Sequence, residues 1–105
     1  MPQIDPANAC QTVITTFECS PGTCADLMER LQDAYRDFIA HQPGFLGAGL
    51  HVNDAQTRIA NYSQWRRRED FQAMLRSDEM RVRNREIAGL CDRFEPVMYE
   101  VAGVF

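Results

Sequence analysis

The chain has 105 residues, of which 45% are hydrophobic and 25% are charged, and its net charge is −4. This composition is typical of one ordinary globular domain, and the acidic balance argues against a nucleic-acid partner, since phosphate binding requires an excess of cations. All 11 basic residues are arginines. The absence of lysine excludes Schiff-base chemistry on the protein and a lysine-anchored pyridoxal cofactor.

Residues 1–9 are expected to form a short lead segment before a single domain over residues 10–105. The lead segment is polar, contains two prolines, and lacks the basic end and apolar run of a signal peptide. No later apolar run is long enough to span a bilayer. We therefore expect a cytoplasmic protein without a membrane partner.

The cysteines follow neither a C-x-x-C pattern nor the spacing of a zinc-ligand quartet. They are Cys10, Cys19, Cys24 and Cys91. Without an export signal, they are expected to be reduced and to pack as small, partly buried hydrophobic side chains. The sequence thus predicts no metal site, and it contains no cofactor motif.

The first half of the chain predicts a strand followed by a helix. Residues 10–19 are rich in Val, Ile, Thr and Phe and end at a Ser-Pro-Gly turn, which favours a strand. Thr23, with Asp26 three residues later, is typical of a helix start. Apolar residues then recur at helical spacing as far as Ile39, and the sequence Gln-Pro-Gly at 42–44 ends the helix.

The second half predicts a hairpin, a helical region and a last strand. Residues 45–53 and 57–65 form two strands around a short turn, which is the pattern of an antiparallel hairpin. A helical region follows over about 68–91, with a break expected at Ser77, a plausible fresh N-cap. The last strand covers about 95–104. The order β-α-β-β-α-β predicts an α+β, ferredoxin-like fold, a four-stranded antiparallel sheet with two helices on one face.

One face of the strand 57–65 carries two groups that are costly to bury unpaired. Period-two alternation places Asn61, Ser63 and Trp65 on the same face, together with Ile59. The Asn61 amide donates and accepts hydrogen bonds, whereas the indole of Trp65 only donates. Two interpretations follow: a core tryptophan beside a solvated asparagine, or a pair in the wall of an apolar pocket aimed at a ligand oxygen.

The opposite side of the hairpin is also rich in apolar side chains. Strict alternation groups Leu46, Ala48, Leu50 and Val52 with Ala60, Tyr62 and Gln64. Alternation alone does not say which side faces the helices. Because one apolar face is left without a cover, we expect two copies to pack sheet to sheet as a homodimer, forming an α/β barrel.

Two further polar residues stand out by position. Asn84 lies four residues after Met80 and three before Ile87, inside the apolar stripe of the second helical region. Its amide is predicted either to meet a ligand or to bond a backbone group. His51 follows Phe45 and two glycines on one strand face, where it serves either proton transfer or structure.

At this point the chain resembles the antibiotic biosynthesis monooxygenase family of dimeric α/β-barrel proteins. The motifs that carry the resemblance are Gln42-Pro43-Gly44-Phe45-Leu46, Asn61-x-x-x-Trp65, Glu69-Asp70-Phe71 and the hydrophobic last strand. Within the family, the chain is most similar to small oxygenases that convert phenolic or anthrone-like polyketide intermediates to quinones. With these it shares Asn-Tyr-x-Gln-Trp, a histidine at His51 and an arginine at Arg85.

The resemblance implies oxygenation of a small aromatic substrate by O₂ with no metal, flavin or haem. The deprotonated substrate itself would supply the electrons that a cofactor usually provides. Asn61 and Trp65 would donate hydrogen bonds to the substrate oxygen, and Arg85 would assist proton transfer. On a helical wheel, however, Arg85 lies away from the apolar stripe, which equally fits a solvated side chain. Substrate contacts are expected from Thr15, Phe45, His51, Phe71 and Asn84.

Two departures from the family pattern bear on function. In haem-degrading members an asparagine on the first strand and an iron-binding histidine are expected where this chain has Thr15 or Thr16 and Asn84, so haem degradation is disfavoured. In the polyketide oxygenases a tyrosine stands at the position of Phe71, whose ring lacks the hydroxyl proton donor. The alternative to an enzyme is a non-catalytic dimer that binds a small ligand or acts as a scaffold.

Overall fold

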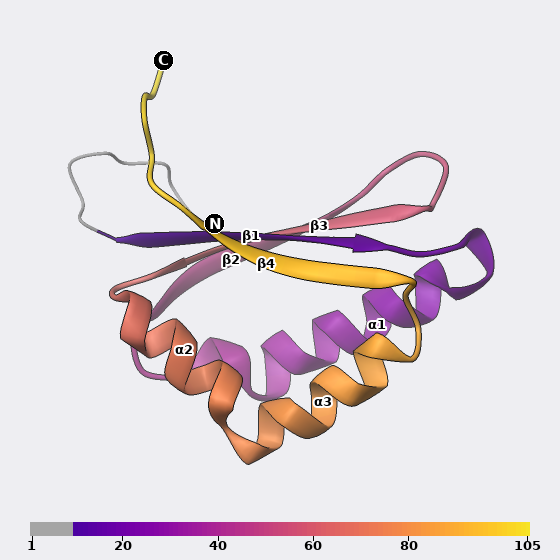
Figure 1. Cartoon of the computed structure of the whole chain (residues 1–105), viewed down its shortest axis with the longest axis horizontal. Coiled ribbons are helices and arrows are strands. Elements are labelled where there is room, and N and C mark those ends of the chain that lie inside the picture. The colour runs from indigo at the N-terminus through magenta and orange to yellow at the C-terminus, as the bar shows by residue number, and fades with distance from the viewer. Residues whose placement is uncertain (1–9) are drawn as a thin grey trace.

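The computed structural model describes residues 10–105 and contains one four-stranded antiparallel sheet with its helices on one face (Figure 1). The predicted lead segment, residues 1–9, lies outside the described residues. The elements are β1 (Gln11–Glu18), α1 (Pro21–Asp37), the 3₁₀ turn η1 (Ile39–His41), β2 (Phe45–Val52), β3 (Arg58–Trp65), α2 (Arg68–Arg76), α3 (Asp78–Ala88) and β4 (Arg93–Tyr99). The strand order β2-β3-β1-β4 confirms the ferredoxin-like fold.

The core lies between the sheet and the three α-helices. From the sheet it receives alternate residues of the two central strands, among them Val13 and Phe17 of β1 and Ile59 of β3. Leu27 of α1 and Ile87 of α3 meet them from the helical side. Period two in the strands and period 3.6 in the helices thus direct apolar side chains to one shared layer.

The helix α1 begins at Pro21, two residues before the predicted start at Thr23. Ser20 occupies the N-cap position, and its backbone N–H donates to the Thr23 hydroxyl at 3.4 Å. Thr23 is therefore the third residue of the helix, where its hydroxyl caps the first turn, and it is not the residue at which the helix begins. Proline at the first helical position fits this start, because its missing N–H would be unpaired there anyway.

The predicted break at Ser77 is confirmed. The helix α2 ends at Arg76 and α3 begins at Asp78. The Ser77 hydroxyl donates to the carbonyl oxygen of Met74 at 2.7 Å and accepts the backbone N–H of Met80 at 3.2 Å. One side chain thus satisfies backbone groups of both helices and fixes the angle between them.

The last strand begins and ends earlier than the sequence predicts. It runs over Arg93–Tyr99 instead of 95–104. β4 pairs only with β1, and its last pair joins Tyr99 to Thr12 near the start of β1. Among residues 10–105, no strand pair extends β4 beyond Tyr99.

The strict alternation expected for β2 is wrong, because the strand contains a β-bulge at Leu46. Phe45 pairs with Trp65, but Gly47 pairs with Gln64, so one extra residue is accommodated between them. After the bulge, Ala48 and Leu50 pair with Ser63 and Asn61 and share their face.

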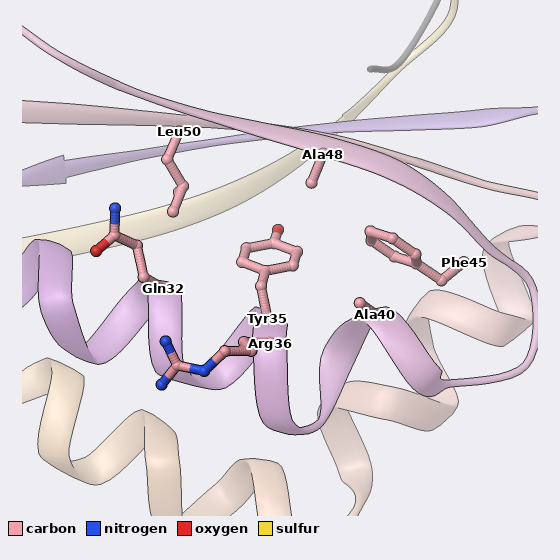
Figure 2. A pocket seen from close by; sticks show the side chains of 7 residues that line it. All are labelled: Gln32, Tyr35, Arg36, Ala40, Phe45, Ala48 and Leu50. Atoms are coloured by element: carbon pink, nitrogen blue, oxygen red, sulfur yellow. The ribbon is translucent and has the colours of Figure 1, made fainter.

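The bulge also separates His51 from Phe45, which the sequence had placed on one face. Figure 2 shows Phe45, Ala48 and Leu50 pointing from β2 toward α1. His51 pairs with Ala60 and lies with the two strand glycines on the face away from the helices. The apolar group predicted for a single face is therefore divided between both faces of the sheet.

Candidate functional site

A small cavity of about 50 Å³ lies beneath the sheet, enclosed by α1, α2 and α3. Four of the predicted site residues line it: Thr15 of β1, Asn61 of β3, Phe71 of α2 and Asn84 of α3. Its other walls are mainly apolar and include Leu31, Ile39, Met74, Leu75, Met80, Ile87 and Phe94. A few polar groups in an apolar hollow are the usual arrangement of a small-molecule site.

Asn61 is a half-buried residue that lines this cavity. Its side-chain oxygen Oδ1 accepts a hydrogen bond from the phenol of Tyr35 at 2.7 Å. Its amide nitrogen Nδ2 makes no hydrogen bond within residues 10–105. Because an amide carries two N–H donors, Asn61 offers donating capacity to a ligand in the cavity.

Tyr35 is a site residue that the sequence did not single out. It lies on α1, lines the cavity, and its helical spacing matches the apolar stripe of that helix. Burial raises the pKa of Tyr35 above its usual value of 10.0, although hydrogen bonding with Asn61 and Ser63 opposes the shift. The phenol is therefore a protonated donor at neutral pH.

Trp65 lies in the core and does not line the cavity. The side chain is fully buried, and its indole N–H donates to the Ser63 hydroxyl oxygen at 3.2 Å. Its ring meets Phe45 and Phe71 edge to face, with centroid separations of 5.4 and 5.8 Å. Trp65 thus supports Phe71, while its own donor is already paired.

Asn84 brings a second amide to the cavity from α3. The residue is half-buried, and its side chain makes no hydrogen bond to another part of the described chain, including the backbone group that would cap it. Thr15 of β1 lines the same cavity and is itself buried. The cavity lining therefore includes amide N–H groups without a hydrogen-bond partner in residues 10–105, one from the sheet and one from a helix.

An open groove lies beside the cavity, between α1 and β2, and Figure 2 shows its lining. Its volume is about 560 Å³. The residues around it are Gln32, Tyr35, Arg36, Ala40, Phe45, Ala48 and Leu50. Tyr35 lines both spaces, so its ring forms part of the wall between the groove and the inner cavity.

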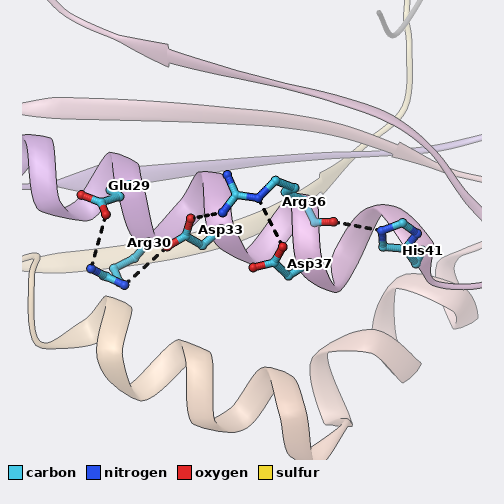
Figure 3. A network of polar contacts seen from close by, with 6 residues as sticks. All are labelled: Glu29, Arg30, Asp33, Arg36, Asp37 and His41. Atoms are coloured by element: carbon cyan, nitrogen blue, oxygen red, sulfur yellow. Dashed lines mark hydrogen bonds and ion pairs between the residues drawn. The ribbon is translucent and has the colours of Figure 1, made fainter.

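Arg36, a lining residue of this groove, forms ion pairs with acidic neighbours on α1. Arg36 pairs with Asp33 and with Asp37, and its carbonyl oxygen is within hydrogen-bond distance of the His41 ring (Figure 3). The carboxylates raise the pKa of Arg36 through hydrogen bonds from its guanidinium. Because its charge is matched locally, Arg36 does not make the groove selective for anions.

Arg85 and His51 are separated from the cavity. Arg85 is exposed on α3 and does not belong to the cavity lining. His51 is exposed on the opposite face of the sheet from Asn61. Phe45 lies nearer, because it lines the groove and contacts Tyr35 at a ring separation of 5.9 Å.

Two further observations concern residues 10–105. No group of three or more His, Cys, Asp or Glu side chains is placed to hold a metal ion there. No helix in that range combines the length and apolar character needed to cross a membrane.

The fold and cavity define a class of small α+β proteins that hold a small, mainly apolar cavity between one antiparallel sheet and its helices. The chain belongs to the antibiotic biosynthesis monooxygenase family, whose model matches residues 11–85. The tetracenomycin-F1 monooxygenase of Streptomyces glaucescens is 34% identical over 74 residues, which cover 70% of this chain and 66% of that relative. The match therefore spans just under two thirds of the relative's length.

Solved structures agree with this assignment. A monooxygenase from the gene ActVA-Orf6 of Streptomyces coelicolor, in complex with nanaomycin D, is 25% identical, with a TM-score of 0.75 over 96% of this chain and 94% of that one. SnoaB, a cofactor-independent oxygenase from Streptomyces nogalater, has a TM-score of 0.80 at 17% identity, covering 90% of this chain and 95% of that one. The second likeness shows the fold alone.

Proposed function

We propose that this protein is a cofactor-independent monooxygenase that oxidises a phenolic or hydroquinone-type aromatic substrate with O₂. The observation that carries the proposal is the Asn61 amide, half-buried in an apolar cavity with its N–H donors unpaired. Membership of the family and the similarity to a tetracenomycin-F1 monooxygenase support an oxygenase activity. The aromatic, polyketide-like class of substrate rests on these relatives.

The reaction requires the substrate anion to react with O₂ directly. A deprotonated phenol gives one electron to O₂, and the resulting radical pair combines into a peroxide on the ring carbon. Loss of water from the peroxide leaves a carbonyl group, so one oxygen atom enters the product and the other leaves as water. The four electrons come from the substrate, which loses its phenol O–H and the C–H of the carbon that bears the peroxide, and from no other reductant.

The cavity residues favour the first of these steps. Asn61 donates to the substrate oxygen as negative charge develops there, and Asn84 offers a second amide from the facing helix. The apolar walls keep water from the anion and strengthen both hydrogen bonds. Phe71 supplies an aromatic contact for the substrate ring.

Substrate binding requires the cavity to widen. Its 50 Å³ is smaller than the roughly 150 Å³ at which an apolar cavity binds benzene. Met74 and Met80 line the helical side, and an unbranched thioether side chain readily changes rotamer to admit a ring. We therefore place the substrate between Asn61 and these two methionines.

The test is oxygen-dependent turnover of a dihydroxyanthrone by metal-free protein. Quinone formation should exceed the rate without protein, should stop under anaerobic conditions, and should resume when O₂ is admitted. With isotopically heavy O₂, one labelled atom should appear in an anthrone's new carbonyl. Two results together would favour the alternative of a non-catalytic binding protein. The compound would be oxidised no faster than without protein, and its addition would quench the fluorescence of Trp65.

A further inference from the structure

Tyr35 occupies a position in the site that the proposed reaction does not yet use. Its hydroxyl is the only hydrogen-bond partner of the Asn61 side chain within the described part of the chain. The carboxamide of an asparagine can flip by about 180°, which exchanges the positions of its oxygen and its nitrogen. In one orientation the N–H donors attract an anion in the cavity, and in the other Oδ1 repels it.

Two hydrogen bonds near the cavity have a defined direction. The indole nitrogen of Trp65 is a donor only, so the Ser63 hydroxyl must act as its acceptor at 3.2 Å. Ser63 and Tyr35 line the same cavity. The phenol of Tyr35 donates its proton to Oδ1 of Asn61 at 2.7 Å, a separation that is typical of an O–H···O bond and short for an N–H···O bond.

We propose that Tyr35 is a positioning residue that holds the Asn61 carboxamide with its N–H donors facing the cavity. The inference rests on the proposed function, because it assigns a role in the same anion-stabilising site. The 2.7 Å contact is short for an N–H···O bond, and a flipped amide would leave the phenol proton without its acceptor, so the flipped amide is disfavoured while the phenol is present. The role thus depends on a hydroxyl from α1 and not on the aromatic ring alone.

Tyr62 provides a matched control on the other side of the sheet. Its hydroxyl also takes part in a side-chain hydrogen bond, accepting from the Gln64 amide at 3.1 Å. It lies on β3 next to Asn61 in sequence, yet does not line the cavity. Tyr62→Phe therefore removes the same group from the same protein without touching the proposed site.

The kinetic experiment is a double-mutant cycle of Tyr35→Phe and Asn61→Ala, with Tyr62→Phe as control. Tyr35→Phe should lower kcat about tenfold, the order of effect of one hydrogen bond, with KM within about twofold of wild type. In the Asn61→Ala background the same change should have no further effect on kcat, because Tyr35 acts through Asn61. An equal loss in both backgrounds, or wild-type kcat in Tyr35→Phe, would overturn the inference.

A second readout does not depend on turnover. The Asn61 side-chain amide signals in a nitrogen–proton NMR spectrum, identified by their loss in Asn61→Ala, should shift in Tyr35→Phe and stay in place in Tyr62→Phe. A wild-type protein without oxygenase activity would end the proposed function, while this spectrum would still decide the positioning role. Unchanged Asn61 signals in folded Tyr35→Phe would show that the phenol does not hold the amide.

Discussion

The carboxyl group of Asp70 fills the space that a β-carbon would occupy at Gly44. The two residues come from the turn before β2 and from the first turn of α2, and an ideal Cβ built at Gly44 overlaps the Asp70 side chain. Gly44 also has a φ of +84°, a conformation that other residues rarely adopt. The turn and the helix therefore approach this closely only because position 44 has no side chain.

Gly44→Ala is expected to destabilise the protein. The strained φ alone costs about 1–3 kcal/mol, and the overlap with Asp70 adds to it. Chemical denaturation should show a lower midpoint with an unchanged slope. The double variant with Asp70→Ala should recover only the part of the loss that is due to overlap with the carboxyl group, because the β-carbon of residue 70 remains 2.6 Å away.

Gly22→Ala is the matched control for this substitution. A β-carbon at Gly22 meets only the Ser20 hydroxyl at 4.0 Å, and the residue lies in the first turn of α1 with ordinary backbone angles. Its stability should be equal to or slightly above that of the wild type. Equal losses at positions 22 and 44 would contradict the steric explanation.

Asn61→Ala and Trp65→Phe are expected to separate chemistry from packing. Loss of the Asn61 donor should lower turnover by about 10²–10³-fold, the usual effect of removing one oxyanion donor. Trp65→Phe removes the bond to Ser63 and should cost about 0.5–1.5 kcal/mol of stability, with a much smaller loss of turnover. Steady-state rates measure the loss of turnover in each variant, and thermal melts measure the loss of stability. A large loss of turnover in a Trp65→Phe variant that stays stable would contradict this prediction.

The sequence predicted part of this site, and the limits have physical causes. Asn61, Ser63 and Trp65 share a face as expected, because β3 has no irregularity and period two holds along it. The orientation of Ala48 and Leu50 was missed, since a bulge depends on the pairing of two strands and leaves no local signature. Tyr35 was missed because its partner lies 26 residues away, and its helical spacing is that of an apolar core residue.

Stability is expected to fall in alkaline solution through Cys19. Desolvation by burial, followed by hydrogen bonding to Cys24, raises the pKa of Cys19 from 9.0 to about 11. The unfolded thiol therefore ionises first, so this stabilising contribution is complete below pH 9 and is lost as the pH rises through about 11. The free energy of unfolding, measured by chemical denaturation at each pH, should decrease less between pH 9 and 11 in Cys19→Ala than in wild type. Cys10→Ala should show the same decrease as wild type.

Ser77→Ala is expected to weaken the junction between α2 and α3. The variant leaves the backbone N–H of Met80 without its cap and removes the bond to the Met74 carbonyl. A lost N-cap costs about 0.5–2 kcal/mol. Ser77→Asp keeps an acceptor for the Met80 N–H and should recover most of the lost stability in thermal melts. A melting temperature as low as that of Ser77→Ala would show that the bond to the Met74 carbonyl contributes more to stability than the cap.

We also expect a homodimer formed through the face of the sheet that α1, α2 and α3 leave uncovered. Val97 and Tyr99 of β4 are 38% and 48% exposed there. Sedimentation at micromolar concentration should give twice the chain mass of 12.0 kDa. Val97→Glu should shift the protein toward monomer, whereas Val82→Glu, at a more exposed valine on α3, should not.

The bulge at Leu46 makes the length of β2 adjustable without changing which of its side chains face the cavity side. Phe45 pairs with Trp65 and Gly47 with Gln64, so removing Leu46 would make these two pairs neighbours in a regular ladder. Leu50 would stay beside Asn61, and His51 would stay on the opposite face. A single-codon deletion at this position would therefore straighten the strand and leave the orientation of every later residue as it is.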